Sequence, residues 1–310
     1  MIELVLKSVL RTEESETWLG EDGQIGATVS SAVNFLHNPV DNNVFACHNH
    51  SITWVTIGSL ITMAKLQGQA KADYVQRMFD EIAPSYDRGN RVMSLGQDMS
   101  WRRIAIRTAA LPAGGAALDI GAGTGDMAFL LAPHAGTVVG IDFAPNMVAL
   151  AQRKARSRES WRHVSFLLAD ALHLPFPDDG FHAVTIAFAI RNVADIRRGL
   201  SEMQRVLAPG GRIVCLEFVK PNSRFVRNGY FTFLRLALPT LGRLSGGRPE
   251  SHRYLAESIK DFYTADDLRL MMREAGFTSV RSKGLNWGTV AVVSGVKDER
   301  SKVAHDRNDS

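Results

Sequence analysis

The segment LDIGAGTGD, residues 118–126, decides the fold class of this 310-residue chain. It continues the apolar run 116–120, which is typical of a buried strand, and a helical pattern follows it. Between the two lie Gly121, Gly123 and Gly125, which allow the backbone to approach a ligand closely and to adopt dihedral angles closed to other residues. The segment therefore predicts a strand, a ligand-binding turn and a helix.

Strand-like and helix-like patterns alternate on the carboxyl side of this turn. Such alternation predicts an α/β, Rossmann-like fold: a doubly wound, mostly parallel seven-stranded sheet with helices on both faces. Two earlier helical patterns, 74–82 and 99–110, predict an N-terminal helical lid. The expected strands are 116–120, 137–142, 164–169, 183–188, 212–218, 280–283 and 289–294, and the later expected helices are 145–156, 196–207 and 265–275.

The first 70 residues differ in composition from the rest of the chain. They carry three basic and seven acidic side chains, a net charge of −4, whereas the remainder has 33 basic and 25 acidic side chains, a net charge of +8. They show no sustained period apart from an apolar run around 52–63, where we expect one short helix. We therefore expect an irregular extension over 1–70, a catalytic domain over 71–297 and a disordered polar tail over 298–310.

The composition excludes several classes of protein. Cys47 and Cys215 are the only cysteines, which excludes a disulfide scaffold and a four-cysteine zinc site. Cys47, His48 and His50 lie close together, but their spacing matches no common ligand pattern, so no metal is expected. No stretch reaches the roughly 18 apolar residues of a spanning helix, and the N-terminus lacks a signal-peptide pattern. We expect a cytoplasmic protein.

Acidic residues at the strand ends discriminate between two cofactors. Asp142 ends the second strand, where a carboxylate can bind ribose hydroxyls, and Asp170, followed by Ala171, closes the third strand beside the expected adenine position. A nicotinamide dinucleotide is the alternative, but its fingerprint places Gly or Ala where this chain has Asp126. A carboxylate at that helix N-terminus opposes a pyrophosphate. S-adenosylmethionine has no phosphate and carries two positive groups, so the pattern favours it.

Three further segments carry a family resemblance: FDEIAPSYD at 79–87, continuing to Trp-Arg at 101–102, then FAIRNV at 188–193 and YLAESI at 254–259. Together they resemble the quinone-biosynthesis C-methyltransferases, the demethylmenaquinone and 2-polyprenyl-6-methoxybenzoquinol methyltransferases. The glycine motif is generic to class I methyltransferases, whereas the last two segments are much more particular. The resemblance covers residues 74–297, nearly three quarters of the chain.

The resemblance implies transfer of a methyl group from S-adenosylmethionine to a ring carbon of a prenylated quinol, demethylmenaquinol to menaquinol, in menaquinone or ubiquinone biosynthesis. It implies cofactor contacts at Thr124, Asp142, Asp170 and Ala171. The chain departs from the family pattern at Ala187, where a serine is usual. With the residues of the turn, the expected cofactor-binding set is Asp119, Gly121, Gly123, Thr124, Gly125, Asp142, Asp170, Ala171 and Ala187.

Three residues are candidates for the chemistry. Arg191 and Asn192 follow the strand 183–188, which places them at the carboxyl edge of the sheet. Arg191 is expected to stabilise a developing phenolate or to orient a water that takes the proton; the alternative is an ion pair that only holds the loop. Asn192 is expected to hydrogen-bond a quinol oxygen. Tyr86 is expected to close over the site from the lid, with a packing role equally open.

The stretch 225–244 interleaves aromatic residues with arginines. We expect it to wall the exit of the prenyl tail and to contact an anionic membrane at the inner leaflet; the alternative is a lid helix with solvated arginines. The substrate is open between a naphthoquinol, which is favoured, a benzoquinol and another small molecule. A non-catalytic cofactor-binding scaffold is the alternative of a different class. The sequence leaves the oligomeric state undecided, with a homodimer as one alternative, and no nucleic acid partner is expected.

Overall fold

The computed structural model describes the backbone of residues 68–236 and 249–299 and of five strands before residue 57. Side chains are described for residues 71–236 and 251–299. The chain divides into two compact units, Met1–Lys65 and Leu66–Ser310.

The first unit contains strands where the sequence predicted an irregular extension with one helix. The expected helix around 52–63 is wrong over residues 51–56, which form a strand, because Ile52, Thr53 and Val55 are β-branched and favour extended backbone. The side chains of Cys47, His48 and His50 lie outside the described residues. β1 (Glu16–Leu19) and β2 (Ile25–Thr28) pair antiparallel, and β3 (Val33–Asn38), β4 (Asn43–His48) and β5 (Ser51–Thr56) form a second antiparallel sheet.

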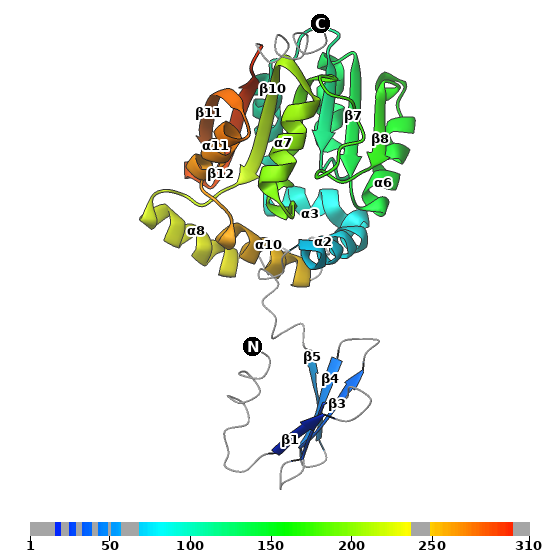
Figure 1. Cartoon of the computed structure of the whole chain (residues 1–310), viewed down its shortest axis with the longest axis vertical. Coiled ribbons are helices and arrows are strands. Elements are labelled where there is room, and N and C mark those ends of the chain that lie inside the picture. Colours follow the sequence, from blue (N-terminus) through cyan, green and yellow to red (C-terminus); the bar gives the residue numbers. More distant parts are fainter. Residues whose placement is uncertain are drawn as a thin grey trace, which may run out of the picture. The chain divides into compact units, whose positions relative to one another are not determined.

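The second unit is built on one seven-stranded sheet (Figure 1). The five strands β10-β9-β6-β7-β8 are parallel, and β12 and β11 extend the β10 edge as antiparallel strands. This order confirms the predicted doubly wound, mostly parallel sheet. The strands are β6 (Ala116–Ile120), β7 (Thr137–Asp142), β8 (Val164–Leu168), β9 (Phe181–Ala187), β10 (Leu207–Phe218), β11 (Phe277–Leu285) and β12 (Val290–Lys297).

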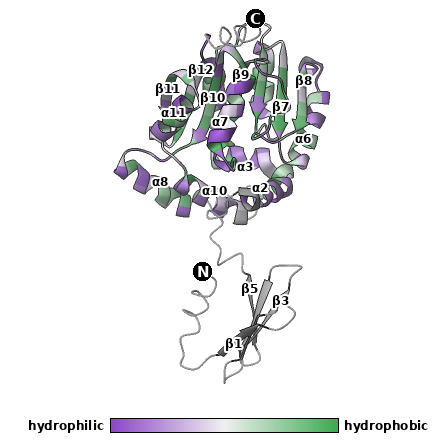
Figure 2. Cartoon of the chain, viewed as in Figure 1, coloured by the Kyte–Doolittle hydropathy of each residue, from purple (hydrophilic) through white to green (hydrophobic). Residues whose placement is uncertain are grey.

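Helices cover both faces of this sheet because alternate residues of each strand point to opposite sides. In β6, Leu118 and Ile120 face one core and Ala117 faces the other. Figure 2 shows the apolar strands enclosed by helices of mixed polarity. The first core includes residues of α7 (Ile196–Val206) and α11 (Ala265–Glu274), and the second includes residues of α4 (Asp98–Ala109), α5 (Asp126–Leu131) and α6 (Pro145–Arg156).

Four further helices gather at the edge where the parallel strands end: α2 (Gly68–Ile82), α3 (Tyr86–Met93), α8 (Arg224–Leu236) and α10 (Pro249–Asp261) (Figure 1). Two hydrogen bonds tie α2 to the loops at this edge. Lys71 Nζ donates to Arg191 O at 3.0 Å, and Gln76 Nε2 donates to Phe143 O at 2.8 Å. The predicted helix 74–82 is part of α2, which with α3 forms the lid; α3 was not predicted as a helix. The predicted helix 99–110 is α4, which packs in the second core.

Most elements begin and end within a few residues of the predicted positions. The main exception is β10, which begins at Leu207, because the strand pairing continues past a register shift before Arg212. In the described ranges, no helix is long and apolar enough to cross a bilayer. Residues 237–244 of the expected membrane stretch and 300–310 of the expected tail lie outside the described residues.

Candidate active site

A cavity of about 480 Å³ lies at the carboxyl edge of the sheet. Its walls come from the turn after β6, the loops after β7, β8 and β9, and helix α2. Parallel strands that end together bring these segments into one place. The cavity collects seven of the residues expected from the sequence: Tyr86, Gly121, Gly123, Asp142, Asp170, Ala171 and Asn192.

The glycine turn forms one wall of this cavity. Gly121 has a φ of +63° and Gly123 a φ of +55°, both in the left-handed region. A Cβ on Gly121 would lie 2.3 Å from the Cβ of Ala189, and a Cβ on Gly123 would lie 3.4 Å from Cε1 of Tyr86. A side chain at position 121 would therefore push the opposite wall away. Gly125 is not among the lining residues; it directly precedes α5.

Backbone amides hold the carboxylate of Asp142 at the floor of the cavity. Its Oδ2 accepts from Gly123 N at 2.8 Å and its Oδ1 accepts from Ala144 N at 2.9 Å. Burial raises the pKa of Asp142 to about 6, and the backbone donors act in the opposite direction. The group is therefore ionised at neutral pH, and two hydrogen bonds leave lone pairs on its oxygens for ligand hydroxyls.

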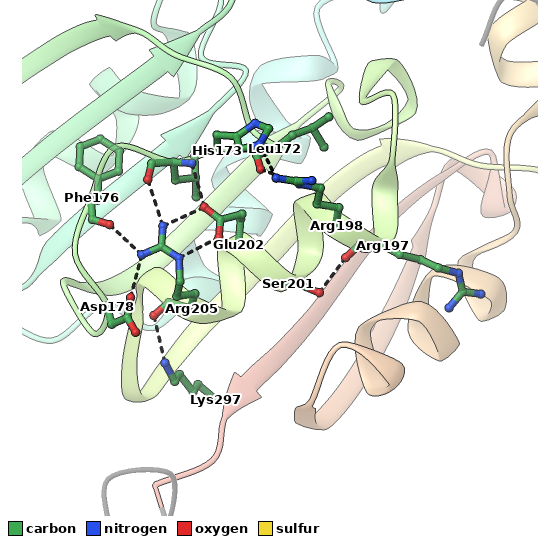
Figure 3. A network of polar contacts seen from close by, with 11 residues as sticks. Leu172, His173, Phe176, Asp178, Arg197, Arg198, Ser201, Glu202, Arg205 and Lys297 are labelled. Atoms are coloured by element: carbon green, nitrogen blue, oxygen red, sulfur yellow. Dashed lines mark hydrogen bonds and ion pairs between the residues drawn. The ribbon is translucent and has the colours of Figure 1, made fainter. Parts of the chain in front are cut away.

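The loop after β8 carries Asp170 and Ala171 and is held by α7 (Figure 3). Leu172 N donates to Asp170 Oδ1 at 2.9 Å, and Arg198 Nε donates to Leu172 O at 3.1 Å. Arg205 donates from Nε, Nη1 and Nη2 to the same loop and to its own helix. It donates to Leu174 O (3.0 Å), Phe176 O (2.8 Å), Asp178 Oδ1 (2.8 Å) and both carboxylate oxygens of Glu202 (2.8 Å each).

Besides Gly125, three more of the expected cofactor residues lie outside the lining of the cavity: Asp119, Thr124 and Ala187. Asp119 is buried within the sheet layer, where it accepts from Thr185 Oγ1 at 2.8 Å, and burial raises its pKa to about 7. Thr124 Oγ1 donates to Asp87 of the lid helix α3. Ala187 is buried in the core on β9. The backbone of the turn, more than these side chains, faces the ligand space.

The residues that line the larger cavity fit S-adenosylmethionine. The glycine turn admits close contact, and the carboxylates of Asp142 and Asp170 suit hydroxyl and amino donors. At the start of α5, Asp126 Oδ2 pairs with Arg91 Nη2 at 2.8 Å. A carboxylate already occupies that helix N-terminus, which disfavours the pyrophosphate of a nicotinamide dinucleotide.

A second cavity of about 100 Å³ adjoins the first and is lined mainly by apolar and aromatic side chains from the lid, α10 and the ends of β9 and β10. The two cavities share Phe79, Tyr86 and Phe188 as lining residues. Phe188 has a φ of +59°, rare for a bulky side chain, which indicates backbone strain held by the surrounding fold. A ligand in the second cavity would be separated from the first only by these aromatic residues.

Arg191 lies in the wall of the smaller cavity and is 8% exposed. Its Nη1 donates to Glu217 Oε1 at 2.6 Å and to Phe188 O at 2.7 Å. Glu217 is 0% exposed and also accepts from Phe218 N at 2.8 Å. Burial raises the pKa of Glu217, and the charge of Arg191 opposes that rise. The ion pair considered as the alternative role of Arg191 is present, and the same side chain also faces the cavity.

Asn192 and Tyr254 connect the two cavities. Tyr254 OH donates to Asn192 Oδ1 at 2.9 Å, which leaves the Asn192 amide NH₂ to donate elsewhere. Asn192 lines the larger cavity and Tyr254 the smaller one. Burial raises the pKa of Tyr254 to about 12, so its hydroxyl is protonated at neutral pH. Burial also raises the pKa of Tyr86.

The sequence did not identify Glu217, Phe188 or Tyr254 as site residues. A lone acid near the end of the apolar strand 212–218 was the available signal for Glu217, because a buried carboxylate needs a partner. Tyr254 and Phe188 begin two of the segments that carry the resemblance. No local pattern indicates which side chain each of them contacts, because their partners are distant in the sequence.

Comparisons with known proteins agree with this arrangement. Residues 67–297 match the model of the ubiE/COQ5 methyltransferase family. Demethylmenaquinone methyltransferase of Thermus thermophilus is 48% identical over 69% of this chain and 97% of its own length. The same-named protein of Clavibacter sepedonicus is 41% identical over 73% and 91%. The ubiquinone/menaquinone biosynthesis C-methyltransferase UbiE of Geobacter sulfurreducens is 40% identical over 76% and 93%.

Solved structures support the fold. The [4+2]-cyclase SpnF matches with a TM-score of 0.56 and 20% identity, over 72% of this chain and 95% of its own. A methyltransferase dependent on S-adenosylmethionine from Thermotoga maritima matches with a TM-score of 0.52 and 21% identity, over 72% and 99%. Because residues 67–297 match the family model and the relatives above are up to 48% identical, the chain belongs to the ubiE/COQ5 methyltransferase family and is an S-adenosylmethionine-dependent methyltransferase.

Proposed function

We propose that this enzyme methylates a ring carbon of a prenylated quinol and converts demethylmenaquinol to menaquinol. The main support for this proposal is the smaller cavity, which Arg191 lines and which shares the lining residues Tyr86 and Phe188 with the larger cavity. The names of the Thermus and Clavibacter relatives favour the naphthoquinol over the benzoquinol.

The cofactor would be held by the turn of Gly121 and Gly123 and by Asp142 and Asp170, and would supply a methyl group on a sulfonium. Transfer breaks the bond between sulfur and the methyl carbon and leaves S-adenosylhomocysteine, and the ring carbon that gains the methyl group loses its proton to water. The residues of the smaller cavity prepare the ring. The guanidinium of Arg191 stabilises negative charge on a quinol oxygen, which raises the electron density at the ring carbon. Glu217 holds this guanidinium in place, and the Asn192 amide donates to the ring or to the cofactor. The quinol is the substrate because a quinone ring carbon lacks that electron density.

The test measures methyl transfer from labelled S-adenosylmethionine to a short-chain demethylmenaquinol and to a short-chain 2-prenyl-6-methoxybenzoquinol. Both substrates are kept reduced under anaerobic conditions. We expect incorporation into the naphthoquinol, loss of most turnover in Arg191→Met, and nearly unchanged cofactor affinity in that variant. The oxidised quinone is the matched control and should take up no label. Cofactor binding without methylation of any quinol would instead support the scaffold function.

We further propose that α8 brings the cytoplasmic enzyme to an anionic membrane surface. Phe225, Phe233 and Leu236 are 88%, 44% and 69% exposed, and Arg224 and Arg235 on the same helix are also exposed. Exposed aromatic and basic side chains on one amphipathic helix fit the headgroup region of a bilayer, where each basic residue contributes about 1 kcal/mol.

Co-sedimentation with vesicles tests this contact. We expect binding to phosphatidylglycerol vesicles at low salt, weak binding to phosphatidylcholine vesicles, and loss of binding in Phe225→Ser/Phe233→Ser. Leu270→Ser, on α11 and 54% exposed, is the matched control. Equal binding by the variant and the wild type would exclude α8 as the contact.

A further inference from the structure

A second buried arginine faces the smaller cavity. Arg102 of α4 lines this cavity together with Arg191. The two side chains are 6% and 7% exposed, and, among the residues whose side chains are described, neither Nε has a hydrogen-bond partner. Buried donors without partners are rare in native proteins. Two of them beside one cavity indicate an acceptor that the chain itself does not supply.

Buried carboxylates act on both guanidinium groups: Asp98, Asp119 and Asp126 lie near Arg102, and Glu217 pairs with Arg191. Asp98 Oδ2 lies 3.9 Å from Arg102 Nε, which is too far for a hydrogen bond. Asp98 instead accepts from Ser94 Oγ at 2.9 Å and pairs with Arg91. Glu217 pairs with Arg191 at 2.6 Å. The carboxylates thus offset part of the charge, and both side chains still line the cavity where a ligand would lie.

Each of the two arginines lies near one ring of an adjacent aromatic pair. The guanidinium carbon of Arg102 lies 5.2 Å from the ring centroid of Phe188, and that of Arg191 lies 5.9 Å from the ring centroid of Phe218. The centroids of the two rings are 4.9 Å apart. Burial raises the pKa of Tyr86, and the positive charges of Arg102 and Arg191 both act against that rise. Both charges therefore act on the same small space beside Tyr86.

We propose that Arg102 and Arg191 bind the two ring oxygens of a 1,4-quinol, one guanidinium to each oxygen. The inference rests on the proposed function and deepens it. One arginine would accept any phenol, whereas two select an aromatic ring that carries two oxygens. Hydrogen bonds from a charged donor are strongest to an anionic oxygen, so the pair favours the singly deprotonated quinol over the neutral quinone. Arg102 is thus a substrate-contacting residue that determines specificity.

The experiment removes a hydroxyl from the ligand and an arginine from the protein in turn. The probes are product analogues already methylated at the reacting carbon: a 2-prenyl-3-methyl-1,4-naphthoquinol and the two naphthols that retain only the 1-hydroxyl or only the 4-hydroxyl. Calorimetry measures their dissociation constants in the presence of S-adenosylhomocysteine, under anaerobic conditions and without turnover. The proteins are the wild type, Arg102→Met, Arg191→Met and Arg103→Met, an exposed neighbour on α4 that serves as the matched control.

We expect the wild type and Arg103→Met to bind the quinol about 10–100-fold more tightly than either naphthol. The two measured ratios are the dissociation constant of each naphthol divided by that of the quinol. In Arg102→Met one of these ratios should fall to within about 2-fold of unity, and in Arg191→Met the other ratio should do so. If Arg102→Met retains both wild-type ratios, or loses both equally, the inference is wrong.

Two further outcomes have a defined meaning. If Arg102→Met fails to fold, as circular dichroism would show, Arg102→Lys is measured instead. Its preference for the quinol should fall relative to one naphthol only, because lysine keeps the charge but loses the forked donors; unchanged preferences would overturn the inference. A wild type that methylates no prenylated quinol overturns the proposed function and this inference with it. A wild type that methylates the quinol, with unchanged ratios in the Arg102 variant, overturns the inference alone.

Discussion

Replacement of Glu217 by glutamine isolates the buried ion pair that holds Arg191. Glu217 is 0% exposed and accepts from Arg191 Nη1 at 2.6 Å and from Phe218 N at 2.8 Å. Glutamine has nearly the same shape but no charge, so the variant leaves the Arg191 guanidinium buried without its counter-ion. Breaking one side of a buried pair costs about 3–5 kcal/mol. That is a large part of the roughly 5–15 kcal/mol that stabilises a typical domain.

Urea denaturation followed by circular dichroism measures the free energy of unfolding. We expect Glu217→Gln to lose about 3–5 kcal/mol. The double variant Glu217→Gln/Arg191→Met should recover most of that loss, because it removes both buried charges. Glu274→Gln is the control: it breaks a pair with Arg197 in which both side chains are well exposed, so it should cost at most about 1 kcal/mol. A cost below about 1 kcal/mol for Glu217→Gln, or additive losses in the double variant, would refute the reasoning.

Four further outcomes are expected. Gly121→Ala should lower the unfolding free energy by about 2–4 kcal/mol and weaken cofactor binding, since its Cβ would collide with Ala189. A variant whose unfolding free energy and calorimetric cofactor affinity equal those of the wild type would contradict this. Cofactor affinity of the wild type should fall as pH decreases through about 6, because the free-enzyme pKa of Asp142 is raised to about 6 and only its carboxylate accepts without donating; Asp142→Asn should bind weakly with a flat pH profile. Arg205→Ala should raise the cofactor KM with little change in kcat, since it releases the loop after β8 from α7; an equal fall in kcat would argue against a loop effect. Removal of residues 1–65 should leave turnover unchanged, because the family match begins at residue 67; loss of folding, seen by circular dichroism, would show that the extension supports the domain.

Local sequence patterns predicted the architecture well where an element is buried on both faces. The segments 116–120 and 137–142 form β6 and β7 with the predicted bounds, since an apolar run between turn residues has few alternatives. The pattern was less informative at 52–63, where an apolar run of this length suits either a strand or a helix. There the β-branched residues formed β5 (Ser51–Thr56).

The candidate site was predicted in part. Gly121, Gly123, Asp142 and Asp170 reach the larger cavity because each lies at the carboxyl end of a parallel strand or within three residues of it. The predicted role of the Thr124 side chain stays a prediction, and the structure directs that hydroxyl to a lid helix. Side-chain direction within a turn depends on what packs above it, and a motif does not contain that information.

The amino-acid sequence by itself determined the α/β fold, the glycine turn and the carboxylates at the strand ends, because these depend on propensity and spacing over a few neighbouring residues. Only the tertiary structure decided that Glu217 forms an ion pair with Arg191, and that Arg102 of α4 lines the same cavity as Arg191. These residues come from elements far apart in the chain. Their contacts exist only once the sheet has brought the ends of β9 and β10 together and the helices have closed over them.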